Sequence, residues 1–261
     1  RMFFLAKSYA FLYFLMKRYF GVHLPGLGRI SRAVKKSRII NLKGLKLFFM
    51  PEVASEYGTH LIGNWQEPET HGFFRKIFEG RHDSDGLFID VGSNIGVFLL
   101  DVSKLSKFKV VGFEPSSDCI KATQHNMKLN EINNFELHNV LLGSSNKDVL
   151  FNSSGSMEGA SVYDSSETSK IHRMVTMDSI DSIQSYSGKN SILLIDVEGY
   201  ELEVIKGGKF FIKNKAPLII FEFNHVSRKH FTLDQILDEL GPDYSLYRLR
   251  KDSYLDLNFN H

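Results

Sequence analysis

Phe88-Ile89-Asp90-Val91-Gly92-Ser93-Asn94-Ile95-Gly96 is the stretch from which the rest of the chain can be interpreted. Its apolar beginning, which starts at Leu87, is typical of a buried parallel strand. Glycines interrupt that run, and an amphipathic stretch over 97–105 follows, so the pattern predicts a strand, a tight turn and a helix. Glycine lacks a Cβ and lets a backbone approach a ligand, and the first N–H groups of a helix are free to bind one. An ordinary β–α turn is the alternative.

A second strand strengthens the interpretation of this turn as a cofactor site. The apolar run over 109–113 ends at Glu114, 22 residues after Gly92. In a doubly wound sheet, a carboxylate at this place accepts hydrogen bonds from the hydroxyls of a ribose. The glycine spacing lacks the third glycine of the G-x-G-x-x-G dinucleotide motif. The sequence therefore predicts a nucleoside-bearing cofactor other than a nicotinamide dinucleotide.

The remaining apolar runs predict the architecture. Further strands are expected over 135–138, 191–195, 218–223, 244–250 and 253–259, with helices between most of them. We therefore expect a Rossmann-like, doubly wound α/β sheet of seven strands over residues 61–261. Segments 148–151 and 171–175 predict a hairpin around a polar loop, 153–169, whose length is typical of a lid or binding loop.

Composition places the chain among ordinary globular proteins. With 261 residues, 43% of them hydrophobic and 24% charged, the chain can bury one sizeable core. The single cysteine, Cys119, excludes an intramolecular disulfide and any cysteine-rich zinc site, and we expect it to be a packed side chain.

Charge is unevenly distributed between a basic N-terminal extension, residues 1–60, and the rest. Residues 1–51 contain 11 Lys or Arg and no acidic residue, whereas the whole chain has 32 basic and 30 acidic residues, so the remainder is net acidic. A basic segment indicates an anionic partner, which would be a lipid surface, a phosphorylated glycan or nucleic acid. A solvated face, or packing on an acidic body, would also explain it.

The extension begins with a helical, apolar and aromatic stretch. Residues 3–16 are too few to span a bilayer, which takes about 20 apolar residues, and Lys7-Ser8 interrupts them. Aromatic residues followed by Lys17-Arg18 suit a helix in a membrane interface. We expect a cytoplasmic protein in which residues 3–20 pack on the body of the chain or form a homodimer contact. Peripheral contact of this helix with the inner face of a membrane is the second interpretation, and a signal anchor is the third.

Several segments, in order, resemble the FkbM-like methyltransferases. In chain order they are Glu67-Pro68-Glu69, 88–96, Gly112-Phe113-Glu114-Pro115, 139–143, 195–201 and 217–222. The resemblance implies the class I fold that uses S-adenosyl-L-methionine and releases S-adenosyl-L-homocysteine. It also implies an enzyme that methylates a hydroxyl of a sugar, glycan or glycolipid, because family members methylate hydroxyls of sugars, glycolipids or polyketides.

The resemblance also assigns the cofactor residues. The turn with Gly92, Asn94 and Gly96 would pass under the methionine end of the cofactor, and Asp90 would meet its amino group. Glu114 would hold the ribose. At the end of the third strand, Asn139 and Val140 would flank the adenine. The alternative for Asn139 is a turn-forming asparagine.

Catalytic candidates follow the fourth and fifth strands, where ligands bind in open α/β sheets. Asp196 and Glu198 follow the fourth strand, Glu222 ends the fifth, and His225 lies just beyond. Asp196 and Glu198 can both face the cleft only if the strand has ended between them. Such a group could supply a general base or hold a divalent cation, whereas Glu198 could instead cap a helix and Glu222 fix a loop. We expect a base and no resident metal.

Two other functions share this fold. A nucleic-acid methyltransferase would explain the basic extension, but the body is acidic and no Asn/Asp-Pro-Pro-Tyr motif is present, so nucleic acid is not the expected acceptor. A scaffold protein that binds the cofactor without turnover is the other alternative.

Overall fold

A parallel five-stranded sheet forms the centre of the computed structural model, which describes residues 2–20, 22, 24–81, 84–151, 170–188 and 190–256. The strand order is β10 (Leu218–Phe221), β9 (Ser191–Ile195), β3 (Leu87–Val91), β4 (Lys109–Phe113) and β5 (Phe135–His138). The chain runs outward from β3 to β5 and then returns to β9 on the other side of β3. This reversal places a topological switch point between β3 and β9, where ligands bind at the carboxyl ends of the strands.

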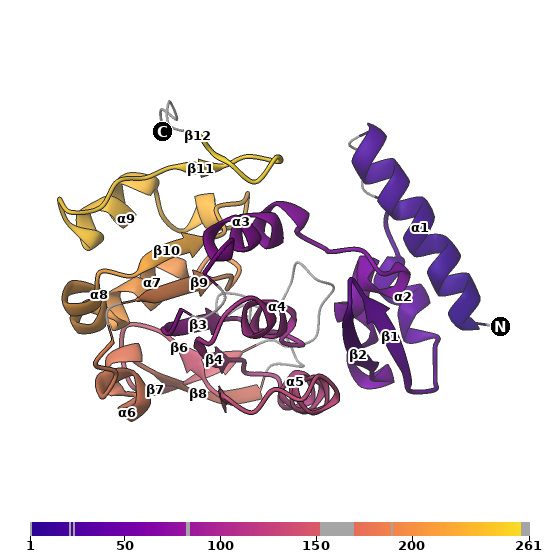
Figure 1. Ribbon diagram of the computed structural model, residues 1–261, viewed down its shortest axis with the longest axis horizontal. Coiled ribbons are helices and arrows are strands. Elements are labelled where there is room, and N and C mark those ends of the chain that lie inside the picture. The colour runs from indigo at the N-terminus through magenta and orange to yellow at the C-terminus, as the bar shows by residue number, and fades with distance from the viewer. Residues whose placement is uncertain are drawn as a thin grey trace.

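Helices cover both faces of the sheet (Figure 1). Phe88 points into a core formed with α3 (Pro68–Phe78), α4 (Val97–Leu105) and α5 (Ser117–Leu129). Leu87, Ile89 and Val91 point into a second core on the opposite face. That core is formed with α6 (Asp181–Gln184), α7 (Glu201–Gly207), α8 (Lys209–Lys215), α9 (Leu233–Leu240) and the 3-10 turn η2 (Met177–Ser179). The three layers confirm the predicted doubly wound α/β class.

The two C-terminal strands do not extend the central sheet, so the expected count of seven is corrected to five for the described residues. β11 (Arg248–Leu249) pairs only with β12 (Leu255–Asp256). Their hairpin is held against α3 instead, because Lys76 Nζ donates to the carbonyl of Asp252 (2.7 Å) and lies 3.1 Å from the centre of the Tyr254 ring. The end of the predicted strand 253–259 lies outside the described residues.

A small second sheet contains the predicted hairpin. Strand β7 (Lys147–Phe151) pairs antiparallel with β8 (Lys170–Val175), and β8 also pairs with β6 (Leu141–Leu142). The hairpin prediction is thereby confirmed, while the loop 153–169 expected to act as a lid lies outside the described residues. One further 3-10 turn, η3 (Ser227–Lys229), precedes α9.

The N-terminal segment folds as a helical and hairpin layer on the α/β body. It comprises α1 (Met2–Phe20), α2 (Leu27–Arg32), the antiparallel strands β1 (Arg38–Leu42) and β2 (Leu45–Phe49), and the 3-10 segment η1 (Pro51–Ile62). The backbone N–H of Phe48 donates to Asn126 Oδ1 of α5 (2.6 Å), and one apolar cluster includes both Ala6 and Leu194. The domain boundary expected at residue 60 stays a prediction. Within the described chain, no helix has the length and apolar character needed to cross a membrane.

Candidate active site

The glycine turn after β3 is a chain of left-handed conformations. Gly92, Asn94 and Gly96 all have positive φ, of 84°, 48° and 76°. The N–H groups of Gly92 and Ser93 both donate to the carbonyl of Phe113 at the end of β4 (2.9 and 3.0 Å). A Cβ on Gly92 would lie 1.9 Å from the carbonyl oxygen of Asp196, and one on Gly96 would lie 2.4 Å from Thr123. Close packing within the protein therefore requires both glycines, whatever ligand the turn holds.

Glu114 closes the turn from the neighbouring strand. Its Oε2 accepts from the backbone N–H of Asn94 (3.0 Å), and its Oε1 accepts from that of Ser116 (2.8 Å). Burial raises the pKa of the Glu114 carboxyl to about 7, although both N–H groups favour the ionised form. Because each carboxylate oxygen has two acceptor positions, each keeps one position for a further hydroxyl donor. The predicted ribose carboxylate thus lies directly against the glycine turn.

The predicted adenine-flanking residues lie beside Glu114. The Asn139 side chain donates to the carbonyls of Glu114 (2.9 Å) and Pro115 (2.8 Å), which ties the end of β5 to the turn after β4. Val140 packs, partly buried, against the core on one face of the sheet. The contacts of Asn139 fit its alternative role as a turn-forming residue, and contact with an adenine remains a prediction for both.

Asp90 is the buried carboxylate of β3. It is only 2% exposed, and its Oδ2 has no hydrogen-bond partner within the described part of the chain. Burial, and then the charges of Glu67 and Glu114, raise the pKa of the Asp90 carboxyl well above its ordinary value. A buried acceptor without a donor is costly, so this position favours a ligand that brings a donor or a positive charge.

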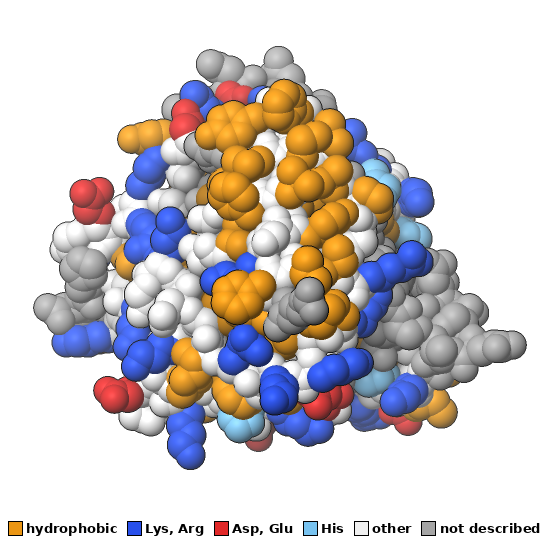
Figure 2. All heavy atoms as spheres, turned by 90° about the vertical axis from the view of Figure 1, so that its right-hand side faces the viewer, with side chains coloured by type: hydrophobic (Ala, Val, Ile, Leu, Met, Phe, Trp, Pro, Cys, Tyr) orange, Lys and Arg blue, Asp and Glu red, His pale blue; other side chains and the backbone are white. Residues whose placement is uncertain are grey.

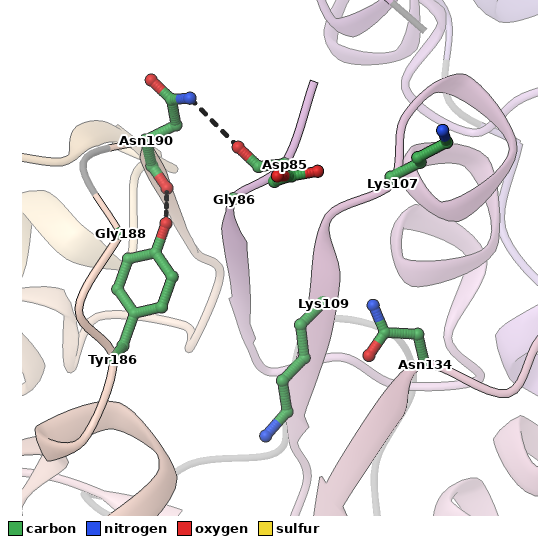
Figure 3. A pocket seen from close by; sticks show the side chains of 8 residues that line it. All are labelled: Asp85, Gly86, Lys107, Lys109, Asn134, Tyr186, Gly188 and Asn190. Atoms are coloured by element: carbon green, nitrogen blue, oxygen red, sulfur yellow. Dashed lines mark hydrogen bonds between the residues drawn. The ribbon is translucent and has the colours of Figure 1, made fainter. Parts of the chain in front are cut away.

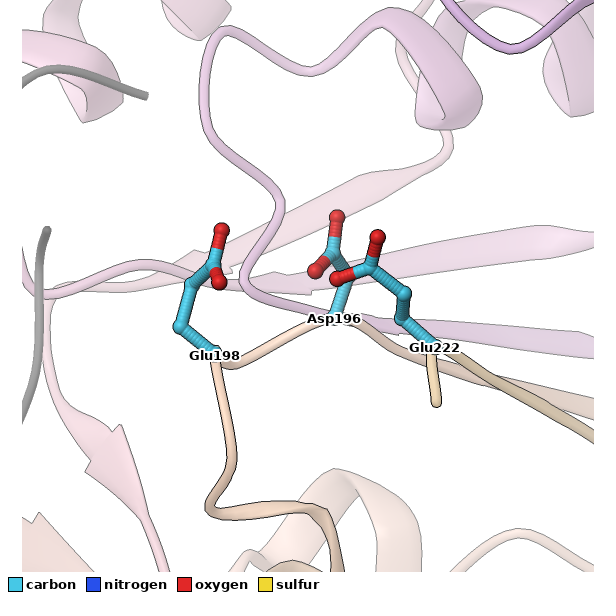
Figure 4. Close-up of side chains that lie close together, drawn as sticks. All are labelled: Asp196, Glu198 and Glu222. Atoms are coloured by element: carbon cyan, nitrogen blue, oxygen red, sulfur yellow. The ribbon is translucent and has the colours of Figure 1, made fainter. Parts of the chain in front are cut away.

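The three predicted catalytic carboxylates meet at the ends of β9 and β10 (Figure 4). Oxygen atoms of Asp196, Glu198 and Glu222 all lie within 4.8 Å of one another, which is close enough to share a cation. We call these three residues the acidic group. The amide of Asn224 donates to Glu222 Oε2 (2.7 Å) and lies 3.4 Å from Glu198 Oε2. His225, the fourth candidate, is exposed and is not part of this group.

Backbone geometry explains how two acids so close in sequence face the same space. Strand β9 ends at Ile195, and Glu198 has a left-handed φ of 52°, followed by Gly199 at 100°. The N-cap residue of α7 is Tyr200 and not Glu198, which corrects the helix cap suggested for Glu198. The buried Glu201 stabilises the turn before this helix, because its Oε1 accepts from the N–H groups of Gly199 (3.1 Å) and Val197 (3.4 Å).

Burial and repulsion between neighbouring carboxylates raise the pKa values of two carboxyl groups at this site. Burial, followed by the charges of Glu67, Glu222 and Glu198, raises the pKa of Asp196 well above its ordinary value. Burial, and then the charge of Glu222, raises the pKa of Glu67 to about 7. Such shifts indicate an excess of negative charge at the strand ends that a cationic ligand would relieve.

Two residues from the segment before β3 also belong to the site, although neither was predicted to be a site residue. Glu67 immediately precedes α3 and adds a fourth carboxyl to the acidic group. Glu56 of η1 accepts from the side chain of Asn94 (2.7 Å), so the N-terminal layer supports the glycine turn. The only sequence signal was the Glu67-Pro68-Glu69 segment of the family resemblance, and Glu56 had none.

A separate pocket of about 500 Å³ opens at the opposite, amino edge of the sheet (Figure 3). It lies between the segments that precede the strands, where the Asn190 side chain donates to the carbonyl of Asp85 (3.0 Å) and Tyr186 OH donates to that of Asn190. None of the predicted site residues lines this pocket. It is therefore distinct from the candidate active site.

Comparison with known proteins gives one family and several distant structures. Residues 90–245, more than half of the chain, match the methyltransferase FkbM domain. No curated protein matches the chain significantly.

Similar solved structures include two from other methyltransferases. The Pyrococcus abyssi tRNA (uracil-54, C5)-methyltransferase, in complex with S-adenosyl-L-homocysteine, has 13% identity and a TM-score of 0.40. The match covers 72% of this chain and 34% of that one, so the chain spans about a third of that enzyme. The precorrin-6y C5,15-methyltransferase of Geobacter metallireducens has 11% identity and a TM-score of 0.39, with 63% and 69% covered.

Proposed function

Because this chain belongs to the methyltransferase FkbM domain family, whose methyl donor is S-adenosylmethionine, we propose that it methylates a hydroxyl of a sugar, glycan or glycolipid. One observation carries the proposal. The glycine turn and the acidic group are in direct contact, since a Cβ on Gly92 would lie 1.9 Å from the Asp196 carbonyl oxygen. A donor held by the turn would therefore have several carboxylates beside it.

The residues of the turn fit S-adenosylmethionine. The cofactor supplies a methyl group that is activated by the positive charge of its sulfur. Glu114 retains acceptor positions suited to the two ribose hydroxyls, and the unpartnered Asp90 Oδ2 suits the ammonium of the methionine end. The surplus of carboxyl groups around Glu67 and Asp196 suits a cationic molecule.

A carboxylate of the acidic group would remove the proton of the acceptor hydroxyl. A sugar hydroxyl is a weak nucleophile, so transfer needs an in-line position and a base. Glu222 is the first candidate for that base because it is the exposed member of the group, and Asn224 fixes one of its oxygens. Asp196 and Glu198 would then orient the acceptor, and His225 could pass the proton to solvent.

An acceptor screen tests the proposal. The wild-type protein is incubated with S-adenosylmethionine labelled in its methyl group, and label is measured in panels of sugars, glycolipids and RNA. We expect label in a sugar or glycolipid, at a position that alkaline hydrolysis does not release, as for a methyl ether. Label in RNA alone would contradict the proposal and support nucleic-acid methylation, which the basic residues of the N-terminal segment favour.

A further inference from the structure

The outward face of α1 is a large apolar surface without a partner in the described structure. Six large apolar side chains of this helix are between 47% and 73% exposed: Phe4, Leu5, Phe11, Leu12, Tyr19 and Phe20. Figure 2 shows hydrophobic side chains running as a long column on this side of the molecule. We call these six side chains the outer face of α1. Monomeric soluble proteins rarely expose a contiguous apolar surface of this kind unless it binds something.

The helix is apolar on both sides, which explains why one side remains uncovered. Ala6 and Ala10 are fully buried, and Phe3, Tyr9 and Tyr13 pack, partly buried, against the same core. This inner face lies on α2 and η1. The outer residues recur at positions 4, 11 and 12, and 19, about two turns apart, so they share the opposite side. A helix that is apolar all round requires a second apolar environment.

Basic side chains surround this face. Residues 1–51 have 11 Lys or Arg and no acidic residue, and Figure 2 shows Lys and Arg side chains on either side of and below the apolar column. Lys35, Lys36 and Lys43, in the segment that follows α1, are exposed. Arg38 is partly buried, with its guanidinium 3.9 Å from the centre of the Phe3 ring. The partner of the outer face must therefore be both apolar and anionic.

A second copy of the chain does not meet that requirement through this face. In a two-fold dimer each outer face would meet its own equivalent, so the basic side chains around the two faces would be brought together. Like charges opposed across an interface cost several kcal/mol. An anionic lipid surface offers acyl chains to the aromatic residues and phosphate groups to the lysines and arginines.

We propose that the outer face of α1 docks on an anionic lipid surface, with the helix lying parallel to the membrane plane. Aromatic side chains enter the boundary between head groups and acyl chains, and the surrounding basic residues contact lipid phosphates. This proposal is independent of the acceptor proposed above, because it rests on α1 and its charges alone. Loss of methyl transfer would leave it standing, and loss of membrane binding would leave the cofactor site standing.

Vesicle flotation tests the proposal on the full 261-residue chain. Vesicles of equal parts phosphatidylcholine and phosphatidylglycerol are compared with vesicles of phosphatidylcholine alone. We expect the protein to float with the anionic vesicles, and to be released at high salt because the Debye length falls from about 10 Å at 0.1 M to about 3 Å at 1 M. Equal binding to both vesicle types would overturn the proposal, as would no binding to either.

Substitutions at exposed positions locate the contact. The double variant Phe4→Ser/Phe11→Ser should lower partitioning about tenfold or more, since each change removes a large apolar group from the bilayer boundary. Phe210→Ser is the matched control, because Phe210 of α8 is 64% exposed on another part of the molecule and should leave partitioning unchanged. An equal loss in both proteins would refute the assignment.

Charge reversal gives a second test that does not alter α1. Lys35→Glu/Lys36→Glu changes two exposed residues between α2 and β1 and should weaken binding to the anionic vesicles severalfold. Sedimentation velocity on the wild type and the Phe4→Ser/Phe11→Ser variant tests whether a second copy of the chain covers the outer face instead. A wild-type dimer that becomes monomeric in Phe4→Ser/Phe11→Ser would assign the face to a second copy and overturn the lipid proposal.

Discussion

Replacing Gly92 with alanine should damage both the stability of the fold and the binding of the cofactor. Gly92 has a φ of 84°, and the added Cβ would lie 1.9 Å from the carbonyl oxygen of Asp196 and 3.0 Å from its carbonyl carbon. The N–H of Asp196 donates to the carbonyl of Val91 (2.9 Å), so the end of β9 cannot move away freely. The substitution therefore forces the ends of β3 and β9 apart.

Three effects contribute to the loss of unfolding free energy in Gly92→Ala. A left-handed conformation costs a non-glycine residue roughly 1–2 kcal/mol. Overpacking at a site that cannot yield adds about 1–3 kcal/mol, and losing the hydrogen bond of Asp196 adds about 1 kcal/mol. We expect Gly92→Ala to lower the free energy of unfolding by about 3–6 kcal/mol, a large share of the roughly 5–15 kcal/mol of a typical protein.

Gly80→Ala separates backbone strain from the clash. Gly80 also has a positive φ, of 69°, but nothing lies within 4 Å of its added Cβ. Only the roughly 1–2 kcal/mol of strain should therefore appear in this control. Thermal unfolding followed by circular dichroism measures both, at about 2–4 °C per kcal/mol for a domain of this size. Equal losses of stability in the two variants would refute the argument that contact with Asp196 requires Gly92.

Three further predictions concern the acids of the chain. Glu222→Gln should lower kcat about 100-fold or more while leaving binding of S-adenosylhomocysteine unchanged, as single-turnover kinetics and calorimetry would show, whereas an unchanged kcat would exclude Glu222 as the base. Asp101→Ala should cost about 1.5–3 kcal/mol in urea unfolding, because it removes the charged acceptor that lies 2.7 Å from the buried His71 ring. Asp118→Ala, in an exposed pair with Lys121, should cost about 0–1 kcal/mol, and similar costs would contradict this contrast. Without cofactor, Glu114 should lower the stability of the fold as pH rises from about 4.5 to about 7, because its folded carboxyl retains a proton that the unfolded chain releases. Melting curves of Glu114→Gln should show a weaker decline over this pH range, and a pH profile identical to that of wild type would contradict the raised pKa.

The sequence predicted the central strands because their patterns are local. Strands 87–91, 109–113, 135–138 and 191–195 were expected where β3, β4, β5 and β9 lie, since each is a run of mainly apolar residues ended by a turn signal. The C-terminal hairpin could not be predicted in the same way. Its position depends on Lys76 and Tyr254, which lie far apart in sequence and meet only after α3 has packed on the sheet.

The residues of the acidic group could be predicted from the sequence, but the backbone conformation that brings them together could not. Parallel strands bring their carboxyl ends to one edge, so Asp196 and Glu222 were expected there together. The left-handed conformation of Glu198 has no sequence signal, because such a φ is uncommon for a residue other than glycine, and it is what turns Glu198 toward the others. The contact between Glu56 and Asn94 depends on tertiary packing of η1 and was missed for that reason.

Calorimetric titration with S-adenosylhomocysteine tests the central claim that the turn after β3 and Glu114 hold the cofactor. The titration compares wild type with Glu114→Gln, and with Glu131→Gln as a control because Glu131 is an exposed carboxylate just beyond α5. We expect saturable binding to wild type and control, and an affinity at least about tenfold lower in Glu114→Gln, since a hydrogen bond to a charged group contributes about 1.5–3 kcal/mol. Failure of wild type to bind, or equal affinity in Glu114→Gln, would contradict the account.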